Sequence, residues 1–391
     1  MFHYRSICGY NEAKLVGYVM SDHAAFIAAI ADRPLDDVPR LVYADYLEEN
    51  GDSARAEFIR VQCELARIAD DNDPRHDELS DRESELLRVH RAEWTIPDLR
   101  GRQEFRRGFV EVVRTTAEWL VAFGPRLFDL APVVHMRIQN ADAHIDALAE
   151  LPGLAQLETL DLTNNSFGMR DRIQRFFSVA RLDRLRRLIL RNNQIWPEAI
   201  QQLAAAPCTR QLTWLELSGN PISDEGAVML AMNAAFTSLR KLIAKCDEVP
   251  YTESVHAAGA AAISASTTLT NLRELNLADH YIGDAGLAAI ASSHNMTGLE
   301  RLNVAYNDIG TIGDNGIEAV VDSRYLTALT LFTYSGNHLS RIAAQALAGW
   351  PRLQRMKRVN LVDCEFATGA REEIWASRWA DRFWLGNEEV E

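Results

Sequence analysis

The 391-residue sequence contains only five cysteines, which are scattered, odd in number and never in a CxxC spacing. Disulfide frameworks and zinc sites need paired or clustered thiols, so neither is expected. No run of about 18 apolar residues occurs that would span a membrane, and the first twenty residues lack the apolar segment of a secretion signal. We therefore expect a cytoplasmic protein that does not associate with membranes.

Positive charge is also scarce, with 41 Lys and Arg against 55 Asp and Glu and a net charge of −14 at pH 7. Nucleic acids are bound by neutralising their phosphates, so they are not the expected partner. The catalytic signatures GxSxG, HExxH, GxxxxGK[ST] and GxGxxG are missing. These absences favour a binding protein over an enzyme, without a cofactor or a metal.

An internal repeat with the pattern LxxLxLxxNxL dominates the sequence. Clear copies are LETLDLTNNSF from Leu157, LRRLILRNNQI from Leu185, LTWLELSGNPI from Leu212, LRELNLADHYI from Leu272 and LERLNVAYNDI from Leu299. Degenerate or closing copies start at Leu239, Leu329 and Met356, and a candidate entry repeat starts at Val133. From Leu157 onward the starts lie 28, 27, 27, 33, 27, 30 and 27 residues apart, which is typical of a stacked repeat array.

Each part of the repeat has a physical role. The leucines of LxL are expected to point into a solenoid, and the residues between them to face outward on a concave parallel sheet. The side-chain amide of the asparagine at the ninth position can hydrogen-bond the backbone groups that lose their partners where the strand ends. At this position Asp247 and His280 predict looser turns. Helical spacing after the strands, as in SDEGAVMLAM from Ser223, predicts helices on the convex face.

These repeats, with helices that begin with D-x-G, resemble the ribonuclease-inhibitor-like class of leucine-rich repeats. The resemblance covers about residues 133–366 and implies an α/β solenoid, a horseshoe with a parallel concave sheet and a helical convex face. In that family cysteine replaces the asparagine, as at Cys364. After the repeats, residues 367–391 place three aromatic residues four apart, which predicts a capping helix for the open end, or alternatively a helix that docks a partner.

Residues 21–100 show helical spacing without the repeat pattern, with three helices predicted before residue 70 and another that reaches Trp94. LVYADYLEENGD and AEFIRVQCELA resemble the bacterial repeat-companion domain, which implies a small all-α N-terminal domain. FRRGFVEVVR resembles the hinge between such a domain and leucine-rich repeats, so residues 101–132 are expected to be a connecting segment and N-terminal cap. Residues 1–20 precede the family pattern and are expected to be an extension.

One acidic group in this N-terminal domain is a candidate for chemistry. It consists of Asp45, Glu48, Glu49 and Glu57. Clustered carboxylates can bind a metal or transfer protons, but ion pairs with neighbours such as Arg40 or Arg55 are the commoner use. Uncharacterised catalysis in this domain is therefore the third functional hypothesis.

The concave face carries the candidate binding site. In the second to fourth repeats its outward positions hold Arg187, Arg191, Trp214, Glu216, Lys241 and Lys245. Trp and Arg are the residue types that most often anchor interfaces, and only Glu216 opposes the four cations, so an acidic or mixed-charge protein surface is the expected partner. Alternatively, Trp214 lies flat under Arg187 and Lys241 in an intramolecular cation–π stack.

The first functional hypothesis is therefore a scaffold that binds a partner protein on the concave face of its repeats. Ribonuclease-inhibitor-like repeats also occur in GTPase-activating proteins and in enzyme inhibitors. The resemblance thus leaves a regulator of an enzyme as the second hypothesis.

Overall fold

The computed structural model describes residues 20–68, 73–99, 101–246 and 249–386. The chain forms two compact units. The front unit holds the residues up to Thr115 together with residues 122–136, and the solenoid unit holds residues 116–121 and everything from Arg137 onward. The predicted N-terminal extension lies almost wholly outside the described residues.

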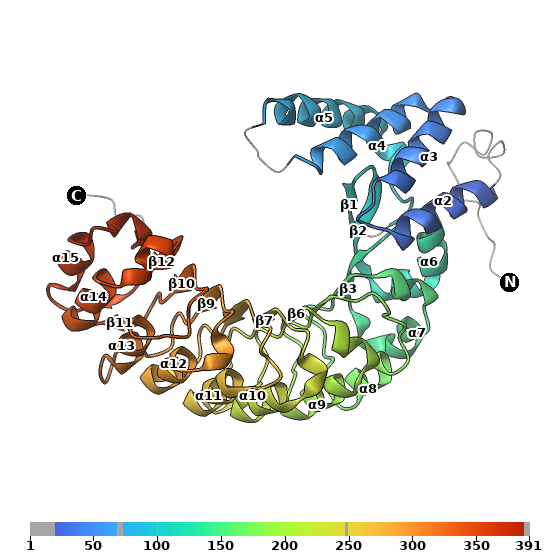
Figure 1. The fold of residues 1–391 in the computed structure, drawn as a ribbon. Helices are drawn as coiled ribbons and strands as arrows, with labels where there is room; N and C mark the ends of the chain where they lie inside the picture. The colour runs from blue at the N-terminus through green and yellow to red at the C-terminus, as the bar shows by residue number, and fades with distance from the viewer. Residues whose placement is uncertain (1–19, 69–72, 100, 247–248, 387–391) are drawn as a thin grey trace. The chain divides into compact units, whose positions relative to one another are not determined.

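The front unit begins with the four predicted helices. They are α2 (Met20–Asp32), α3 (Val38–Glu49), α4 (Ser53–Leu65) and α5 (Pro74–Trp94), shown in Figure 1. Asp52 caps α4, because its side chain accepts a hydrogen bond from the backbone N–H of Arg55 at 3.2 Å. The apolar faces of the first three helices pack into one core with Phe109. The predicted helical character of this region is confirmed.

The front unit also contains an antiparallel hairpin, formed by β1 (Gly101–Arg106) and β2 (Phe109–Thr116). Its turn packs on α4: the backbone N–H of Gly108 donates to Gln62 Oε1 at 2.5 Å, and a Cβ at this glycine would lie 2.5 Å from the Ile59 side chain. Gly108 also has φ +89°, which favours glycine. The segment expected to be a hinge thus contributes Phe109 to the front core, and α6 (Ala117–Leu130) follows it.

In the solenoid unit each predicted repeat from Leu157 onward forms one three-residue strand. The strands are β4 (Thr159–Asp161), β5 (Arg187–Ile189), β6 (Trp214–Glu216), β7 (Lys241–Ile243), β8 (Glu274–Asn276), β9 (Arg301–Asn303), β10 (Leu331–Thr333) and β12 (Arg358–Asn360). All neighbours in this series pair parallel and in register. β3 (His135–Gln139) precedes β4 in the sheet order. The predicted uninterrupted parallel sheet is therefore confirmed from β4 to β12.

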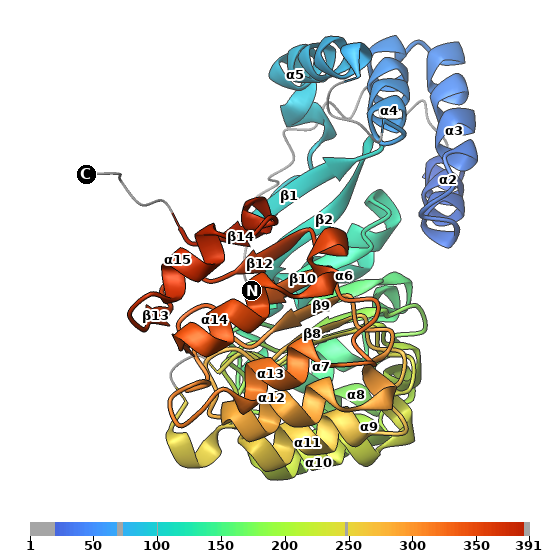
Figure 2. The same cartoon turned by 60° about the vertical axis from the view of Figure 1, so that its left-hand side comes forward.

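Helices cover the convex side of the solenoid unit and lie side by side there (Figures 1 and 2). They are α7 (Ile145–Ala149), α8 (Arg172–Phe177), α9 (Pro197–Ala205), α10 (Ser223–Met232), α11 (Ala257–Ala265), α12 (Gly283–Ala291), α13 (Asn315–Val321) and α14 (Arg341–Ala348). The core lies between this layer and the sheet, where the leucines of the LxL triplets, such as Leu188 and Leu215, are fully buried. The predicted α/β solenoid is thus confirmed.

The D-x-G residues that open the convex helices join one repeat to the next. Asp224 does not cap its own helix; its Oδ1 accepts the backbone N–H groups of His256 and Gly259 in the following repeat, both at 2.8 Å. Asp284 bonds the N–H of Gly316 in the same way, at 2.9 Å. A Cβ at either glycine would lie within 3 Å of the aspartate oxygen, so each aspartate contact requires a glycine in the following helix.

The predicted asparagines form a buried ladder under the turns. The Nδ2 of Asn220 donates to the carbonyls of Leu190 in the preceding repeat and Leu217 in its own, at 2.8 and 2.7 Å. Its Oδ1 accepts the backbone N–H groups of Asn193 and Ile195, at 2.8 and 3.0 Å. One side chain therefore satisfies four buried backbone groups, which explains its place in the repeat.

The prediction of a looser turn at His280 is wrong, because the imidazole replaces the asparagine. Its Nε2 lies 2.5 Å from the Ala244 carbonyl, and the backbone N–H of Val255 donates to its Nδ1 at 3.1 Å. A carbonyl only accepts and an N–H only donates, so the ring is neutral and carries its proton on Nε2. Cys364 likewise donates to the Tyr334 carbonyl, at 3.5 Å. Asp247 lies outside the described residues.

His280 predicts a pH-dependent stability for the solenoid. Burial lowers the pKa of His280 from 6.5 to about 4. At a pH between these two values, His280 is protonated in the unfolded chain but neutral in the folded chain. The stability of the solenoid is therefore complete above pH 6.5 and falls as the pH drops towards 4. The expected loss is about 3 kcal/mol. Urea denaturation of wild type and His280→Asn at pH 7 and pH 4 checks this, because asparagine keeps both bonds without titrating. An equal pH dependence in both proteins would contradict it.

The C-terminal segment does not form the single aromatic-faced helix predicted for residues 367–391. Helix α15 (Ala370–Trp375) is short, a 3-10 turn covers Ala380–Arg382, and β14 (Phe383–Trp384) adds to the sheet beside β12 in parallel. A second small parallel pair is formed by β11 (His338–Leu339) and β13 (Glu365–Phe366). The last layer of the array is therefore flanked by an edge strand as well as a helix.

Candidate partner-binding face

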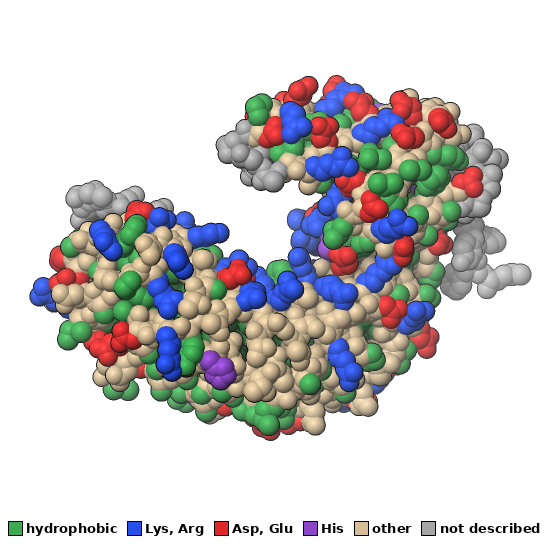
Figure 3. Space-filling view, viewed as in Figure 1, with side chains coloured by type: hydrophobic (Ala, Val, Ile, Leu, Met, Phe, Trp, Pro, Cys, Tyr) green, Lys and Arg blue, Asp and Glu red, His purple; other side chains and the backbone are tan. Residues whose placement is uncertain are grey.

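The six predicted site residues lie on or just beyond three neighbouring strands, β5, β6 and β7. Strand register sets Arg187, Trp214 and Lys241 side by side across the sheet. The central leucine of each strand is buried while these three side chains are exposed or half-buried, which confirms their outward orientation. Figure 3 shows Lys and Arg side chains gathered along the inner rim of the solenoid, with acidic side chains between them.

Trp214 stands between two cations. The Arg187 guanidinium carbon lies 5.0 Å from the centre of the indole ring, and Lys241 Nζ lies 4.0 Å from it. The structure thus contains the intramolecular cation–π stack that was the alternative interpretation of these residues. Trp214 Nε1 is buried and has no hydrogen-bond partner among the described residues. The stack holds the ring in one position, and both cations remain at the surface.

The expectation that Glu216 alone opposes the cations is wrong. Lys241 Nζ lies 2.9 Å from Glu274 Oε1 on the next strand, and Lys245 Nζ lies 3.3 Å from Asp279 Oδ2. The four cations of the site therefore face three carboxylates, and one of these, Glu274, also pairs with Arg301 at 2.6 Å. Glu274 holds the third position of the following repeat and is in register with Lys241.

Glu216 is half-buried, like the other two acids of this face. Burial raises its pKa, whereas the hydrogen bonds from Ser218 and the charges of Arg191 and Lys241 act in the opposite direction. The carboxylate is thus partly removed from water before any partner arrives. Together, these groups can form ion pairs of either sign and offer one large aromatic surface.

A family model described as Leucine Rich repeat matches residues 211–231 and 268–291. These segments contain β6 with α10 and β8 with α12, each a strand followed by its convex helix. The solenoid is built of leucine-rich repeats. The matched copies are among those with complete LxL triplets, and the copies between and around them keep the same register.

Several solved structures resemble this leucine-rich-repeat protein. A Bacteroides fragilis protein is 13% identical, with 77% of this chain and 81% of that chain covered and a TM-score of 0.35. An internalin from Listeria monocytogenes is 13% identical, with 71% and 87% covered and a TM-score of 0.32. The Rad7 and Elc1 complex of yeast gives 12% identity, 98% and 99% coverage and a TM-score of 0.40. A search of curated proteins found no match.

The acidic group in front of the leucine-rich repeats is divided between two arginines. Arg60 bonds Asp45 at 2.7 Å and Glu48 at 2.6 Å, and Arg82 bonds the Glu57 carboxylate at 2.6 and 2.7 Å. Among the residues that the structure describes, no three His, Cys, Asp or Glu side chains are placed to hold a metal ion. The ion pairs account for three of the four acids.

The two arginines expected to pair with these acids have other partners. Arg40 is fully buried and pairs with Glu111, whereas the Arg55 guanidinium lies over aromatic rings, including that of Trp94 at 4.9 Å. That part of the prediction is therefore wrong.

In the described part of the chain, no helix combines the length and the apolar character needed to cross a membrane.

Proposed function

We propose that this protein is a cytoplasmic, non-catalytic scaffold that binds a partner protein through the concave face of ribonuclease-inhibitor-like repeats. In this proposal the front unit is a repeat-companion domain and serves as a second interaction module. The observation that supports it best is the position of Trp214, held between Arg187 and Lys241 on the central strand of the candidate face. Large aromatic side chains in such surroundings are common interface anchors.

The contacts within the face favour binding, because they order the side chains in advance. Freezing a long side chain costs conformational entropy when a partner binds. Lys241 is already held by Glu274 at 2.9 Å and lies against the Trp214 ring, so less of this cost remains. Since cations and carboxylates alternate here, the partner surface best matched to it has mixed charge.

Replacing Trp214 by alanine is expected to weaken partner binding by at least about 2 kcal/mol, roughly 30-fold, because the central aromatic surface is lost. The partner would first be captured from a lysate with the wild-type protein. Calorimetry would then compare the variants. Trp196→Ala is the matched control, because this tryptophan is 41% exposed and lies directly before convex helix α9.

The melting temperature of each variant separates lost binding from lost folding. Undiminished affinity in a combined Trp214→Ala, Arg187→Ala and Lys241→Ala variant would exclude the concave face. The search for the partner site would then move to the front unit. If the captured partner is an enzyme whose rate changes on binding, the scaffold acts as a regulator.

A further inference from the structure

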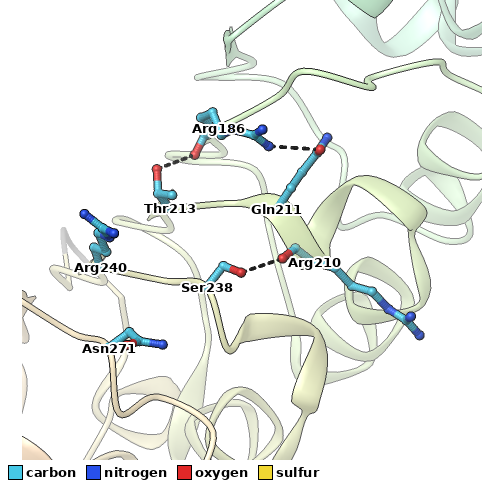
Figure 4. A pocket seen from close by; sticks show the side chains of 7 residues that line it. All are labelled: Arg186, Arg210, Gln211, Thr213, Ser238, Arg240 and Asn271. Atoms are coloured by element: carbon cyan, nitrogen blue, oxygen red, sulfur yellow. Dashed lines mark hydrogen bonds between the residues drawn. The ribbon is translucent and has the colours of Figure 1, made fainter.

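A polar pocket of about 450 Å³ lies along the lateral edge of the solenoid, where the strands β5 to β7 begin. Three arginines line it, Arg186, Arg210 and Arg240, together with four neutral polar side chains and no acid (Figure 4). The pocket is open to solvent, and its lining is mainly polar. The pocket is strongly basic although the whole chain carries a net charge of −14.

The repeat itself builds this pocket. Arg186, Thr213 and Arg240 hold the second position of three successive repeats, directly before the outward residues of the concave face. Backbone bonds keep them in register: the N–H of Thr213 donates to the Arg186 carbonyl at 2.8 Å, and that of Arg240 to the Thr213 carbonyl at 2.9 Å. Adjacent strands lie about 4.8 Å apart, so the two arginines flank Thr213 at a separation of about 10 Å. Their long side chains can therefore reach one ligand between them.

The neutral side chains form a fixed wall, because each is already bonded to a neighbouring backbone carbonyl. These bonds run from Thr213 to Arg186 at 3.2 Å, from Ser238 to Arg210 at 2.7 Å, from Gln211 to Leu182 at 2.7 Å and from Asn271 to Thr237 at 2.9 Å. The wall therefore needs no ligand to hold its shape. The donors that remain available are mainly those of the guanidinium groups.

Most of these guanidinium donors are unused. Arg186 donates one hydrogen bond to Gln211 Oε1 at 2.9 Å. In the described part of the chain, the side chains of Arg210 and Arg240 have no hydrogen-bond or ion-pair partner. In Figure 4, Arg186 extends towards Gln211, Arg240 stands on the opposite side of Thr213, and Arg210 points away from the others. Arg186 and Arg240 thus flank Thr213 with their guanidinium groups apart, and both side chains would turn towards Thr213 to share a ligand.

We propose that this edge pocket binds a dianionic phosphate group. The planar fork of arginine matches two oxygens of such a group, and two arginines balance its two negative charges. A carboxylate offers one charge and two oxygens, so it would use only one of the two forks. Free phosphate and a phosphorylated side chain share this chemistry. The proposal does not depend on the concave-face function.

Titration calorimetry of the full chain tests the pocket with three probes: inorganic phosphate, a short phosphoserine peptide and the same peptide with serine. Binding of a phosphate-bearing probe is expected to weaken at least about tenfold in Arg186→Ala with Arg240→Ala, because charge-assisted hydrogen bonds are lost. Arg186→Lys with Arg240→Lys keeps the charge without the fork and should give an intermediate loss. Arg355→Ala is the matched control, an exposed arginine on a later 3-10 turn.

Tighter binding of the phosphopeptide than of phosphate would support the proposal and assign the ligand to a phosphorylated chain. Equal binding would support it and show that the pocket recognises the phosphate group alone. The proposal is overturned if no phosphate probe binds, if the serine peptide binds equally well, or if the double alanine variant binds as wild type does with an unchanged melting temperature. Trp214→Ala should leave phosphate binding unaltered, so failure of this proposal and failure of the concave-face proposal are distinguishable.

Discussion

Replacing Arg40 by methionine is expected to lower the stability of the front unit by about 3–5 kcal/mol, because it leaves a buried carboxylate without its counter-ion. Arg40 is fully buried, pairs with Glu111 on β2 and donates to the Asp36 carbonyl at 2.9 Å. Burial raises the pKa of Glu111, and the charge of Arg40 offsets part of that effect. Without the arginine, Glu111 must either stay charged in the core or take up a proton. Both outcomes destabilise the fold.

Two further variants isolate this effect. Arg40→Met combined with Glu111→Leu should recover most of the loss, since apolar residues can replace a buried ion pair at little cost. Arg60→Met removes two solvent-accessible ion pairs, with Asp45 and Glu48, and should cost less than about 1 kcal/mol. Two compact units can unfold in separate transitions, so hydrogen exchange of the α3 amides is the suitable measurement. If Arg40→Met is as mild as Arg60→Met, the pair does not stabilise the core.

The strands could be predicted from the sequence almost residue by residue, because burial of the LxL leucines leaves the chain one register. Leu242 and Leu275, for example, are in register on adjacent strands, although the repeat that separates them is 33 residues long. Strand alternation then places the outward residues without further information. That is why Trp214 could be located on the concave face in advance.

The side-chain partners could not be predicted to the same extent. Alternation shows that Lys241 and Glu274 both face outward, but which carboxylate the lysine reaches depends on rotamers. At His280, comparison with the repeat pattern shows only that the asparagine is missing. Asparagine and neutral histidine both provide a hydrogen-bond donor and an acceptor on opposite sides of one small group, and this is the chemical property that the turn requires.

The C-terminal segment shows how long-range pairing overrides local periodicity. Its aromatic spacing favours a helix, yet α15 ends at Trp375. Ser377 then donates to the Ala348 carbonyl at 2.7 Å and accepts the N–H of Trp379, which turns the chain. The N–H of Leu361 can then donate to the Trp384 carbonyl at 2.8 Å. An unpaired edge of β12 would expose backbone hydrogen-bonding groups, and pairing with β14 satisfies them. The residue spacing within the C-terminal segment cannot show that this edge is available.

Replacing Leu275 by alanine is expected to cost the solenoid about 2–5 kcal/mol, because the change leaves a cavity in the middle of the array. Leu275 is fully buried on β8, in register with Leu242 on one side and Leu302 on the other. A cavity at this position weakens the contacts with both neighbouring repeats, whereas one in the last repeat would weaken only one such contact.

Since each repeat touches only its neighbours, this loss can appear as melting around β7 to β9 before the ends of the array unfold. Hydrogen exchange resolved by segment, together with urea denaturation, measures both the size and the place of the effect. Ile342→Ala is the control, because this α14 side chain is 65% exposed and its loss should change stability by no more than about 0.5 kcal/mol. An unaltered denaturation midpoint and unaltered exchange in Leu275→Ala would show that the leucine layers do not stabilise the array. Loss confined to β7–β9 would establish that the repeats transmit stability only to their nearest neighbours.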